Sequence, residues 1–216
     1  MRIKLFPACR RTLLILLAVL LPSLAVQAEP IRIVALGDSL TAGLGLSRDE
    51  AFPARLQAAL RARGYDVVIV NGGVSGDTAS AGAARLDRSV PRGTHGVILE
   101  LGANDALSGI DPAVTEAALD DILSRLRRRG IPVLLAGMLA PPSRGLVYMS
   151  RFQAIFPRLA REHGVAFYRF FLAGVAGVPA LNLPDGMHPN AAGVDVIVAR
   201  LLPTAEAWLA TIAAGR

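Results

Sequence analysis

The chain has 216 residues, 53% of them hydrophobic, which is enough for one well-buried domain. No linker rich in Pro, Gly or Ser divides it, and it contains no internal repeat. Its 23 basic and 17 acidic residues give a formal charge of +6, which is spread unevenly along the chain.

The first 28 residues have the three regions of a secretory signal peptide. Four basic residues come first, the apolar run TLLILLAVLL follows, and a small-residue ending closes at Ala28. The apolar stretch at 12–25 is shorter than the roughly 20 residues that span a bilayer, which disfavours the alternative of an uncleaved anchor. We expect a signal peptide at 1–28, cleavage after Ala28, export to a bacterial periplasm or medium, and one domain at 29–216.

Removal of this segment changes both the charge and the cysteine content. It takes away four of the 23 basic residues and none of the 17 acidic ones, leaving 19 against 17 and a formal charge of +2. The high charge is therefore weak support for a nucleic-acid partner, and none is expected. Cys9, the sole cysteine, is removed as well, which excludes a disulfide, a thiolate nucleophile and a cysteine-ligated metal in the mature chain.

From residue 31 onward, short aliphatic runs alternate with longer segments of helical period. This alternation predicts an α/β fold, with a parallel sheet covered by helices on both faces. The expected strands are residues 31–36, 67–70, 97–101, 133–137 and 165–170.

The helix expected after residue 111 has the clearest boundaries. Asp111 can cap it, Pro112 suits its first turn, and Gly130 suits its exit. Two further apolar stripes of helical spacing precede Gly164 and follow a cap at Asn190, and they are read as core rather than as cofactor-binding segments. The loosest stretch, A-P-P-S-R-G at 140–145, is expected to be a surface loop.

The stretch V-A-L-G-D-S-L-T-A-G places Ser39 at the turn from the first strand into a helix. In an open parallel sheet, ligands bind outside the carboxyl ends of the strands, so these loops are where chemistry is expected. A serine here exposes its hydroxyl and directs its backbone N–H toward a pocket. Taken alone, however, the motif favours a simple helix cap at Ser39 or Asp38.

Two further strand ends carry candidate hydrogen-bond donors for an anion. In N-G-G-V-S-G-D-T at 71–78, Gly76 precedes a capping residue and can direct its N–H at an anion, whereas the earlier glycines fit a tight turn. In E-L-G-A-N-D at 100–105, Asn104 can offer its side-chain amide to a developing oxyanion. An ordinary Asx turn is an equally good reading of Asn104 alone.

The last strand end carries a carboxylate and an imidazole in D-G-M-H-P-N at 185–190. Three residues of separation on a turn let Asp185 fold back onto Nδ1 of His188, which leaves Nε2 free as a base. The other two histidines lack such a neighbour, and helix or strand ends explain them. A serine, two oxyanion donors and an Asp–His pair in this order are difficult to explain by capping alone.

These four blocks resemble the SGNH (GDSL) hydrolase family, in particular its exported bacterial branch of thioesterase, lysophospholipase and arylesterase enzymes. The resemblance extends from about residue 31 to about residue 200. It implies that Ser39 is the nucleophile, that His188 and Asp185 complete a triad, and that Gly76 and Asn104 join the Ser39 N–H in an oxyanion hole. It also implies a flavodoxin-like three-layer αβα sandwich with a five-stranded parallel sheet.

Two positions depart from the family pattern. The third block reads G-A-N-D where relatives usually carry G-G-N-D, so Ala103 adds a methyl group beside the expected oxyanion hole. We expect altered geometry there more than lost activity. The loop from 140 to Tyr148 occupies the place of a substrate-facing loop in relatives, and its residues leave the acyl-chain preference open.

The resemblance implies ester and thioester hydrolysis without a metal or organic cofactor, by a monomer acting on small acyl substrates. Activity should fall as acid protonates His188, because an imidazolium cannot accept the serine proton. A carbohydrate esterase that deacetylates polysaccharide is the alternative within the same class. A flavodoxin-like binding protein is disfavoured because no phosphate-binding fingerprint follows the first strand. An ordinary α/β-hydrolase is disfavoured because the chain lacks a G-x-S-x-G elbow.

Overall fold

The fold is built on one sheet of five parallel strands, in a computed structural model that describes residues 29–215. The expected signal peptide lies outside the described residues. The strand order is β2-β1-β3-β4-β5, which is the flavodoxin-like order. The strands are β1 (Ile31–Gly37), β2 (Val67–Gly73), β3 (Gly96–Glu100), β4 (Val133–Ala136) and β5 (Ala166–Tyr168). The α/β fold class and all five strands are confirmed.

Strand β2 extends further than the sequence predicts. It pairs with β1 as far as Gly37 opposite Gly73, so the glycines expected in a tight turn belong to the strand. Their small size serves close packing, because a Cβ on Gly73 would lie 2.2 Å from the backbone nitrogen of Ala42. Strand β5, in contrast, is shorter than expected at both ends.

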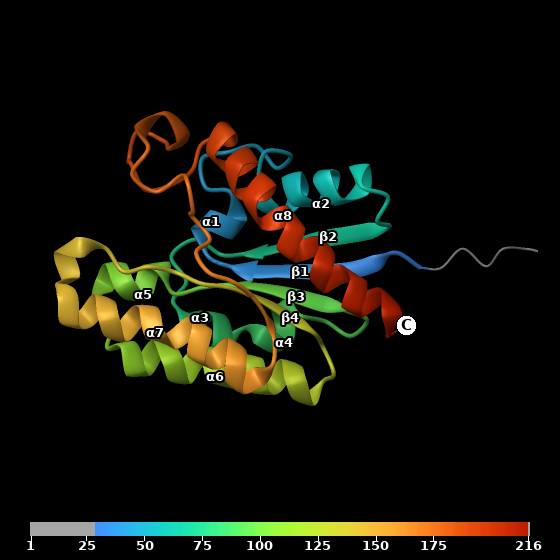
Figure 1. The fold of residues 1–216 in the computed structure, drawn as a ribbon, viewed down its shortest axis with the longest axis horizontal. Helices are drawn as coiled ribbons and strands as arrows, with labels where there is room; N and C mark the ends of the chain where they lie inside the picture. Colours follow the sequence, from blue (N-terminus) through green and yellow to red (C-terminus); the bar gives the residue numbers. More distant parts are fainter. Residues whose placement is uncertain (1–28, 216) are drawn as a thin grey trace, which may run out of the picture.

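Helices cover both faces of the sheet (Figure 1). One face carries α1 (Ser39–Ala42), α2 (Phe52–Ala62) and α8 (Ala191–Ala214). The other carries the remaining α-helices, which are α3 (Ala79–Ala84), α4 (Leu86–Ser89), α5 (Ala103–Ser108), α6 (Pro112–Arg128) and α7 (Leu146–His163). Two short 3₁₀ helices, η1 (Pro142–Arg144) and η2 (Pro179–Leu181), lie in the loops after β4 and β5. The surface loop expected at 140–145 therefore contains a helical turn.

The predicted helix signals are borne out by the caps. Asp111 accepts a hydrogen bond from the backbone N–H of Ala113, and Asn190 accepts one from Gly193. Helix α6 begins at Pro112, as its sequence predicts. Helix α7 ends at Gly164 in the left-handed conformation that glycine tolerates best.

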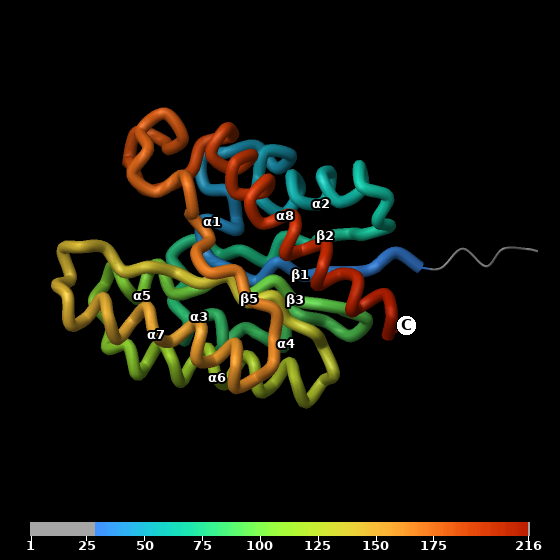
Figure 2. Tube along the Cα trace, in the orientation of Figure 1, coloured from blue at the N-terminus to red at the C-terminus, as the bar shows by residue number. Residues whose placement is uncertain are grey.

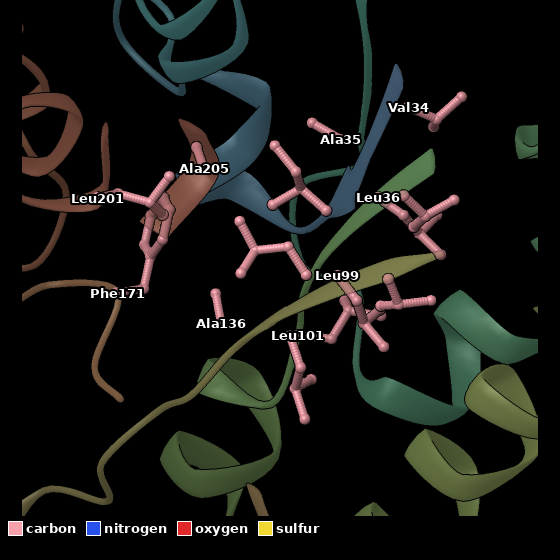
Figure 3. Packing of buried hydrophobic residues seen from close by; sticks show 14 of the residues in the cluster. Val34, Ala35, Leu36, Leu99, Leu101, Ala136, Phe171, Leu201 and Ala205 are labelled. Carbon is pink, nitrogen blue, oxygen red and sulfur yellow. The ribbon is translucent and has the colours of Figure 1, made fainter. Parts of the chain in front are cut away.

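The core lies on both faces of the sheet and is formed by the apolar stripes of the helices. Figure 3 shows Leu36 and Leu99, from neighbouring strands, in one cluster with Leu201 of α8 and Phe171. Phe171 is fully buried and meets the ring of Phe52 edge-on, with the ring centroids 4.9 Å apart. Each such buried side chain stabilises the fold by about 1.5–3 kcal/mol.

Helix α8 is long and apolar enough to span a membrane by length and composition, with a mean hydropathy of 1.4 over a stretch of 18 residues. In this fold ten of its residues are buried, among them Leu201 and Trp208. Its apolar side therefore packs on the sheet, as expected for a core helix.

The parallel strands bring their carboxyl ends to one edge of the sheet. The chain trace in Figure 2 shows the loops after β4 and β5 leaving the sheet at this edge, the first past α5 and the second past α1. These loops carry the residues expected to perform chemistry.

Candidate active site

Ser39 is the first residue of α1 and is separated from the end of β1 only by Asp38. The cap of this short helix is Asp38, whose carboxylate accepts the backbone N–H of Leu40 at 2.9 Å. Gly37 allows the sharp turn to pack closely, because a Cβ there would lie 2.1 Å from the hydroxyl of Thr41. Asp38 supplies the cap, so the Ser39 hydroxyl is left free to face another group.

Ser39, His188 and Asp185 lie in one hydrogen-bonded row. The distance from Ser39 Oγ to His188 Nε2 is 2.9 Å, and that from His188 Nδ1 to Asp185 Oδ2 is 2.7 Å. A carboxylate can only accept, so Nδ1 carries the hydrogen in the neutral ring and Nε2 accepts from the serine hydroxyl. This is the arrangement in which a serine can lose its proton to a histidine.

The carboxylate of Asp185 is held by its own turn. Its Oδ1 accepts the backbone N–H groups of His188 at 3.0 Å and Met187 at 2.9 Å. These bonds, first that from His188 and then that from Met187, lower the pKa of Asp185 to about 2. Asp185 is therefore ionised at neutral pH and can orient the imidazole.

The loop that carries this pair is closed on itself. The backbone N–H of Leu183 donates to the carbonyl of His188 at 2.7 Å, and that of Asn190 donates to Leu181 at 3.0 Å. Asn182 is buried and donates its side-chain amide to the carbonyls of Val175 and Val178, both at 2.8 Å. The segment 181–190, called here the Asp–His loop, is thus fixed by local hydrogen bonds, and its buried Asn182 attaches it to the preceding segment.

Asn104 is the second residue of α5 and lies beside Asp38. Its side-chain nitrogen donates to the carbonyl of Asp77 at 2.9 Å and to Asp38 Oδ2 at 3.2 Å. Gly76 lies in the loop next to Asp77, with a φ of 88° that favours glycine. The structure therefore brings the Gly76 loop against Asn104, but it gives no hydrogen bond between Gly76 and Ser39 among the described residues.

Two acidic side chains are buried beneath the serine. Burial raises the pKa of Asp38 to about 6, although the Leu40 N–H and the charge of His188 act in the opposite direction. Burial, and then the charge of Asp38, raise the pKa of Glu100 well above its usual range. Glu100 accepts the hydroxyl of Thr41 at 2.6 Å, and its Oε1 has no hydrogen-bond partner in the described chain. These surroundings favour a neutral Glu100.

A cavity of about 550 Å³ opens beside the serine. Ser39, Asn104 and His188 line it, whereas Asp185 and Gly76, the other two residues expected at the site, are not in its described lining. Its remaining walls are mostly apolar and come from α5, α7 and the loops after β4 and β5. They include Leu107, Met138, Leu139, Pro141, Pro142, Met149, Leu172 and Met187. Such a cavity is within the size range of small-molecule sites.

Ala103, the departure from the family pattern, is also part of this wall. It is the first residue of α5, directly after Gly102, which has a φ of 114°. The added methyl group thus belongs to the residue before Asn104, and Asn104 keeps its own position in α5. Within residues 29–215, no cluster of three or more His, Cys, Asp or Glu residues is placed to hold a metal ion.

The sequence analysis missed two residues that hold the site together. Arg85 is 9% exposed and donates to Asp77, to Ser89 and to the carbonyls of Gly37 and Gly72. It therefore joins the ends of β1 and β2 to the Gly76 loop. Arg85 lies nine residues after Gly76 in the sequence, but only the fold shows which loops it reaches.

Asp105 is the second missed residue. It is fully buried, and its carboxylate accepts the backbone N–H of Ala79 and the hydroxyl of Thr115, both at 2.9 Å. These bonds tie α5 to α3 and α6. Its position directly after Asn104 in the third block is the feature of the sequence that could have identified it. Its hydrogen bonds hold in place the helix that carries Asn104.

A flavodoxin-like sheet with a serine, a histidine and an aspartate joined at its carboxyl edge is the architecture of a hydrolase. The chain belongs to the GDSL-like Lipase/Acylhydrolase family, whose sequence profile matches residues 35–196. The predicted family resemblance is therefore confirmed, and with it the assignment of the chain as an ester-hydrolysing enzyme.

Several characterised proteins are similar to it. Esterase TesA of Pseudomonas aeruginosa is 35% identical over 200 residues, which cover 92% of this chain and 100% of TesA. The arylesterase of Vibrio mimicus is 35% identical, covering 89% and 90% of the two chains. Thioesterase 1/protease 1/lysophospholipase L1 of Escherichia coli is 37% identical, covering 81% and 82%. The crystal structure of TesA matches 82% of this chain and 99% of its own with a TM-score of 0.78.

Proposed function

We propose that the protein is an exported serine hydrolase that cleaves acyl esters and thioesters through a triad of Ser39, His188 and Asp185. The observation that carries this proposal is the hydrogen-bonded row from Ser39 Oγ through the imidazole to Asp185, with distances of 2.9 and 2.7 Å. The row ends at the mouth of a mostly apolar cavity, where an acyl chain can lie.

In the proposed reaction, His188 Nε2 takes the proton of Ser39 as Oγ attacks the acyl carbonyl carbon. The resulting tetrahedral intermediate collapses when the imidazolium returns the proton to the leaving alcohol or thiol. Water, deprotonated by His188, then attacks the acyl-enzyme and releases the carboxylic acid. Asp185 holds the ring in the required tautomer and stabilises its cationic form.

We assign the oxyanion hole to the backbone N–H groups of Ser39 and Gly76 and to the Asn104 amide. In the free enzyme both hydrogens of the Asn104 side chain are directed at protein oxygens, at 2.9 Å to Asp77 and 3.2 Å to Asp38. The longer contact is the weaker one, so the hydrogen toward Asp38 is the one that an oxyanion would share. Donors of this kind are worth roughly 100-fold to 1000-fold in rate.

The apolar walls favour acyl chains as substrates. The names of the relatives span esters of aryl alcohols, acyl thioesters and lysophospholipids, and we extend these three classes to this chain as its substrate range. A carbohydrate esterase is the second candidate from the sequence, but the wall of methionine, leucine and proline side chains disfavours an acetylated sugar. We also propose that the enzyme acts as a monomer, without a cofactor or nucleic acid.

Residues 1–28 are proposed to direct export and to be removed, after which the enzyme acts in the periplasm or outside the cell without stable membrane insertion. Mass spectrometry of protein from a periplasmic extract tests this directly. A first residue at Glu29 supports the proposal, and an intact N-terminus on membrane-bound protein contradicts it.

The central test is Ser39→Ala, assayed on p-nitrophenyl esters and acyl-CoA thioesters of increasing chain length. We expect kcat to fall about 10⁴-fold or more, because the nucleophile is lost. Ser150→Ala, an exposed serine on α7, is the matched control and should retain parental activity. A Ser39→Ala variant as active as the parent contradicts the proposal. Acetylated xylan hydrolysed faster than the acyl panel would favour the carbohydrate esterase.

A further inference from the structure

Glu100 is a buried acidic residue that the proposed mechanism does not use. It is the last residue of β3, its side chain is fully buried, and it pairs in the sheet with Gly37 at the end of β1. Directly after Gly37 the chain turns into the residues that carry Ser39. The stretch 37–41, called here the serine turn, therefore starts beside Glu100.

The serine turn is too short to be stable alone. Helix α1 has four residues, whereas isolated helices shorter than about 12 residues are marginal in water. The side chain of Asp38 caps the helix, but this hydrogen bond lies within the turn itself. The position of Ser39 relative to the sheet is therefore set by contacts from outside the turn.

Glu100 supplies two such contacts through one oxygen. Its Oε2 accepts the hydroxyl of Thr41 at 2.6 Å and, over a longer distance of 3.4 Å, the backbone N–H of Asp38. Asp38 and Thr41 lie on either side of Ser39 in the sequence, and both are fully buried. One carboxyl oxygen thus binds the turn before and after its serine.

The same carboxyl group also packs against the start of the turn. A Cβ at Gly37 would lie 2.5 Å from Glu100 Oε2 and 2.6 Å from the Glu100 carbonyl oxygen. These distances are too short for a Cβ, so glycine is required at this position to leave space for the carboxyl. Packing and hydrogen bonds from one side chain therefore act on the same turn.

The surroundings of Glu100 favour an uncharged carboxyl. Within residues 29–215 it forms no ion pair, and its Oε1 has no hydrogen-bond partner. Burial, and then the charge of Asp38, raise the pKa of Glu100 well above its usual range. A neutral carboxyl accepts through its carbonyl oxygen, so Oε2 is the carbonyl and Oε1 the hydroxyl. A glutamine amide has this same shape and accepts in the same way.

We propose that Glu100 is a positioning residue for Ser39, whose uncharged carboxyl holds the serine turn and so directs the Ser39 hydroxyl at His188. Ser39 Oγ lies 2.9 Å from His188 Nε2, and a displacement of about 1 Å at such a contact costs about 100-fold in rate. Glu100 is not a general acid or base, because its side-chain hydrogen bonds in the described chain are to Asp38 and Thr41. The inference rests on the proposed function, since it needs Ser39 as the nucleophile.

Two substitutions of Glu100 test this role through kcat and KM for p-nitrophenyl esters. Glu100→Leu removes the acceptor, and we expect kcat to fall about 100-fold because Ser39 is no longer held in place. KM should stay within about twofold, because Glu100 is absent from the described lining of the cavity beside Ser39. Glu100→Gln retains an acceptor for Thr41 and should keep kcat within about threefold. Glu162→Leu, at an exposed glutamate of α7, is the control and should match the parent.

Thr41→Val tests the same contact from its other partner. Valine has nearly the shape of threonine but no hydroxyl, so kcat should fall about tenfold while the protein stays folded. In the double variant with Glu100→Leu, the loss should not exceed that of Glu100→Leu alone, because both changes remove one shared interaction. Urea unfolding checks that each variant is folded under the assay conditions. Where Glu100→Leu is unfolded, Thr41→Val decides the test.

The inference is overturned if Glu100→Leu, or Thr41→Val in its place, keeps the parental kcat. It is also overturned if Glu100→Gln loses as much kcat as Glu100→Leu, or if KM rises by as large a factor as kcat falls. Failure of the proposed function is a separate result, because Ser39→Ala would then be as active as the parent whatever the Glu100 variants do.

Discussion

Asp38 combines a structural role with an unfavourable location. It caps α1 through Leu40 and accepts from Asn104, yet it is fully buried beside Glu100. The sequence analysis offered Asp38 as a helix cap, and the family resemblance implied that Asp185 is the acid of the triad. The raised pKa means that the fold stabilises the neutral form of Asp38 relative to the charged form. The charged form of Asp38 therefore lowers the stability of the protein.

Asp38→Asn should stabilise the protein at alkaline pH and lose that advantage in acid. The folded pKa of Asp38, about 6, lies above its ordinary value of 3.8, so the contribution of Asp38 to parental stability falls as pH rises from about 4 to about 7. Asparagine removes this dependence. The difference in free energy of unfolding between variant and parent should grow by on the order of 2 kcal/mol over this range, measured by urea unfolding.

Asp195→Asn is the control, since the Asp195 side chain is 58% exposed and makes only a surface contact with Arg55. Loss of such an exposed carboxylate should change the free energy of unfolding by less than about 0.5 kcal/mol. A difference between Asp38→Asn and the parent that stays constant with pH would mean that Asp38 has an ordinary pKa in the fold.

At the scale of elements, Arg85 connects the end of β1 to the stretch that runs from the end of β2 to Asp77. It lies between α3 and α4, and its guanidinium reaches the ends of β1 and β2 and the side chain of Asp77. Only an arginine offers enough donors in a planar fork for these partners. The oxyanion residues proposed here therefore depend on a side chain that contacts no substrate.

Arg85→Leu should lower the free energy of unfolding by about 3–5 kcal/mol, because it leaves the largely buried carboxylate of Asp77 without its cation. Chemical denaturation measures the loss. Arg88→Leu, an exposed residue of α4, should change stability by less than about 0.5 kcal/mol. A loss for Arg85→Leu as small as that for Arg88→Leu would show that this network contributes little.

The elements with strong local signals could be predicted from the sequence. Apolar runs and caps locate the five strands and α6, and the four blocks identify the residues that meet at the carboxyl edge. The end of β2 could not be predicted, because Gly72 and Gly73 look like a turn and only pairing with β1 makes them a strand. Arg85 and Asp105 could not be predicted either, since their roles depend on which loops the sheet brings together.

At the scale of the whole molecule, stability comes from burial on both faces of the sheet and not from covalent links. Cys9 is the only cysteine, so the chain cannot form an internal disulfide. The thermal midpoint should therefore be the same with and without dithiothreitol. Scanning calorimetry in the two buffers measures it on the mature protein and on the chain that retains residues 1–28, with Cys9→Ser of the longer chain as the control. A lower midpoint in reductant for the parent alone would indicate a disulfide between two chains.

The Asp–His loop also bears on how the catalytic groups could be rebuilt elsewhere. Asp185 and His188 are aligned by hydrogen bonds inside a segment of ten residues, 181–190, so their mutual geometry does not depend on the sheet. Only one alignment is left to the tertiary structure, the 2.9 Å approach of the imidazole to Ser39. For protein design, this segment could be transferred as one unit that already holds an acid and a base. A new scaffold would then need to place one loop against one serine, instead of placing three side chains independently.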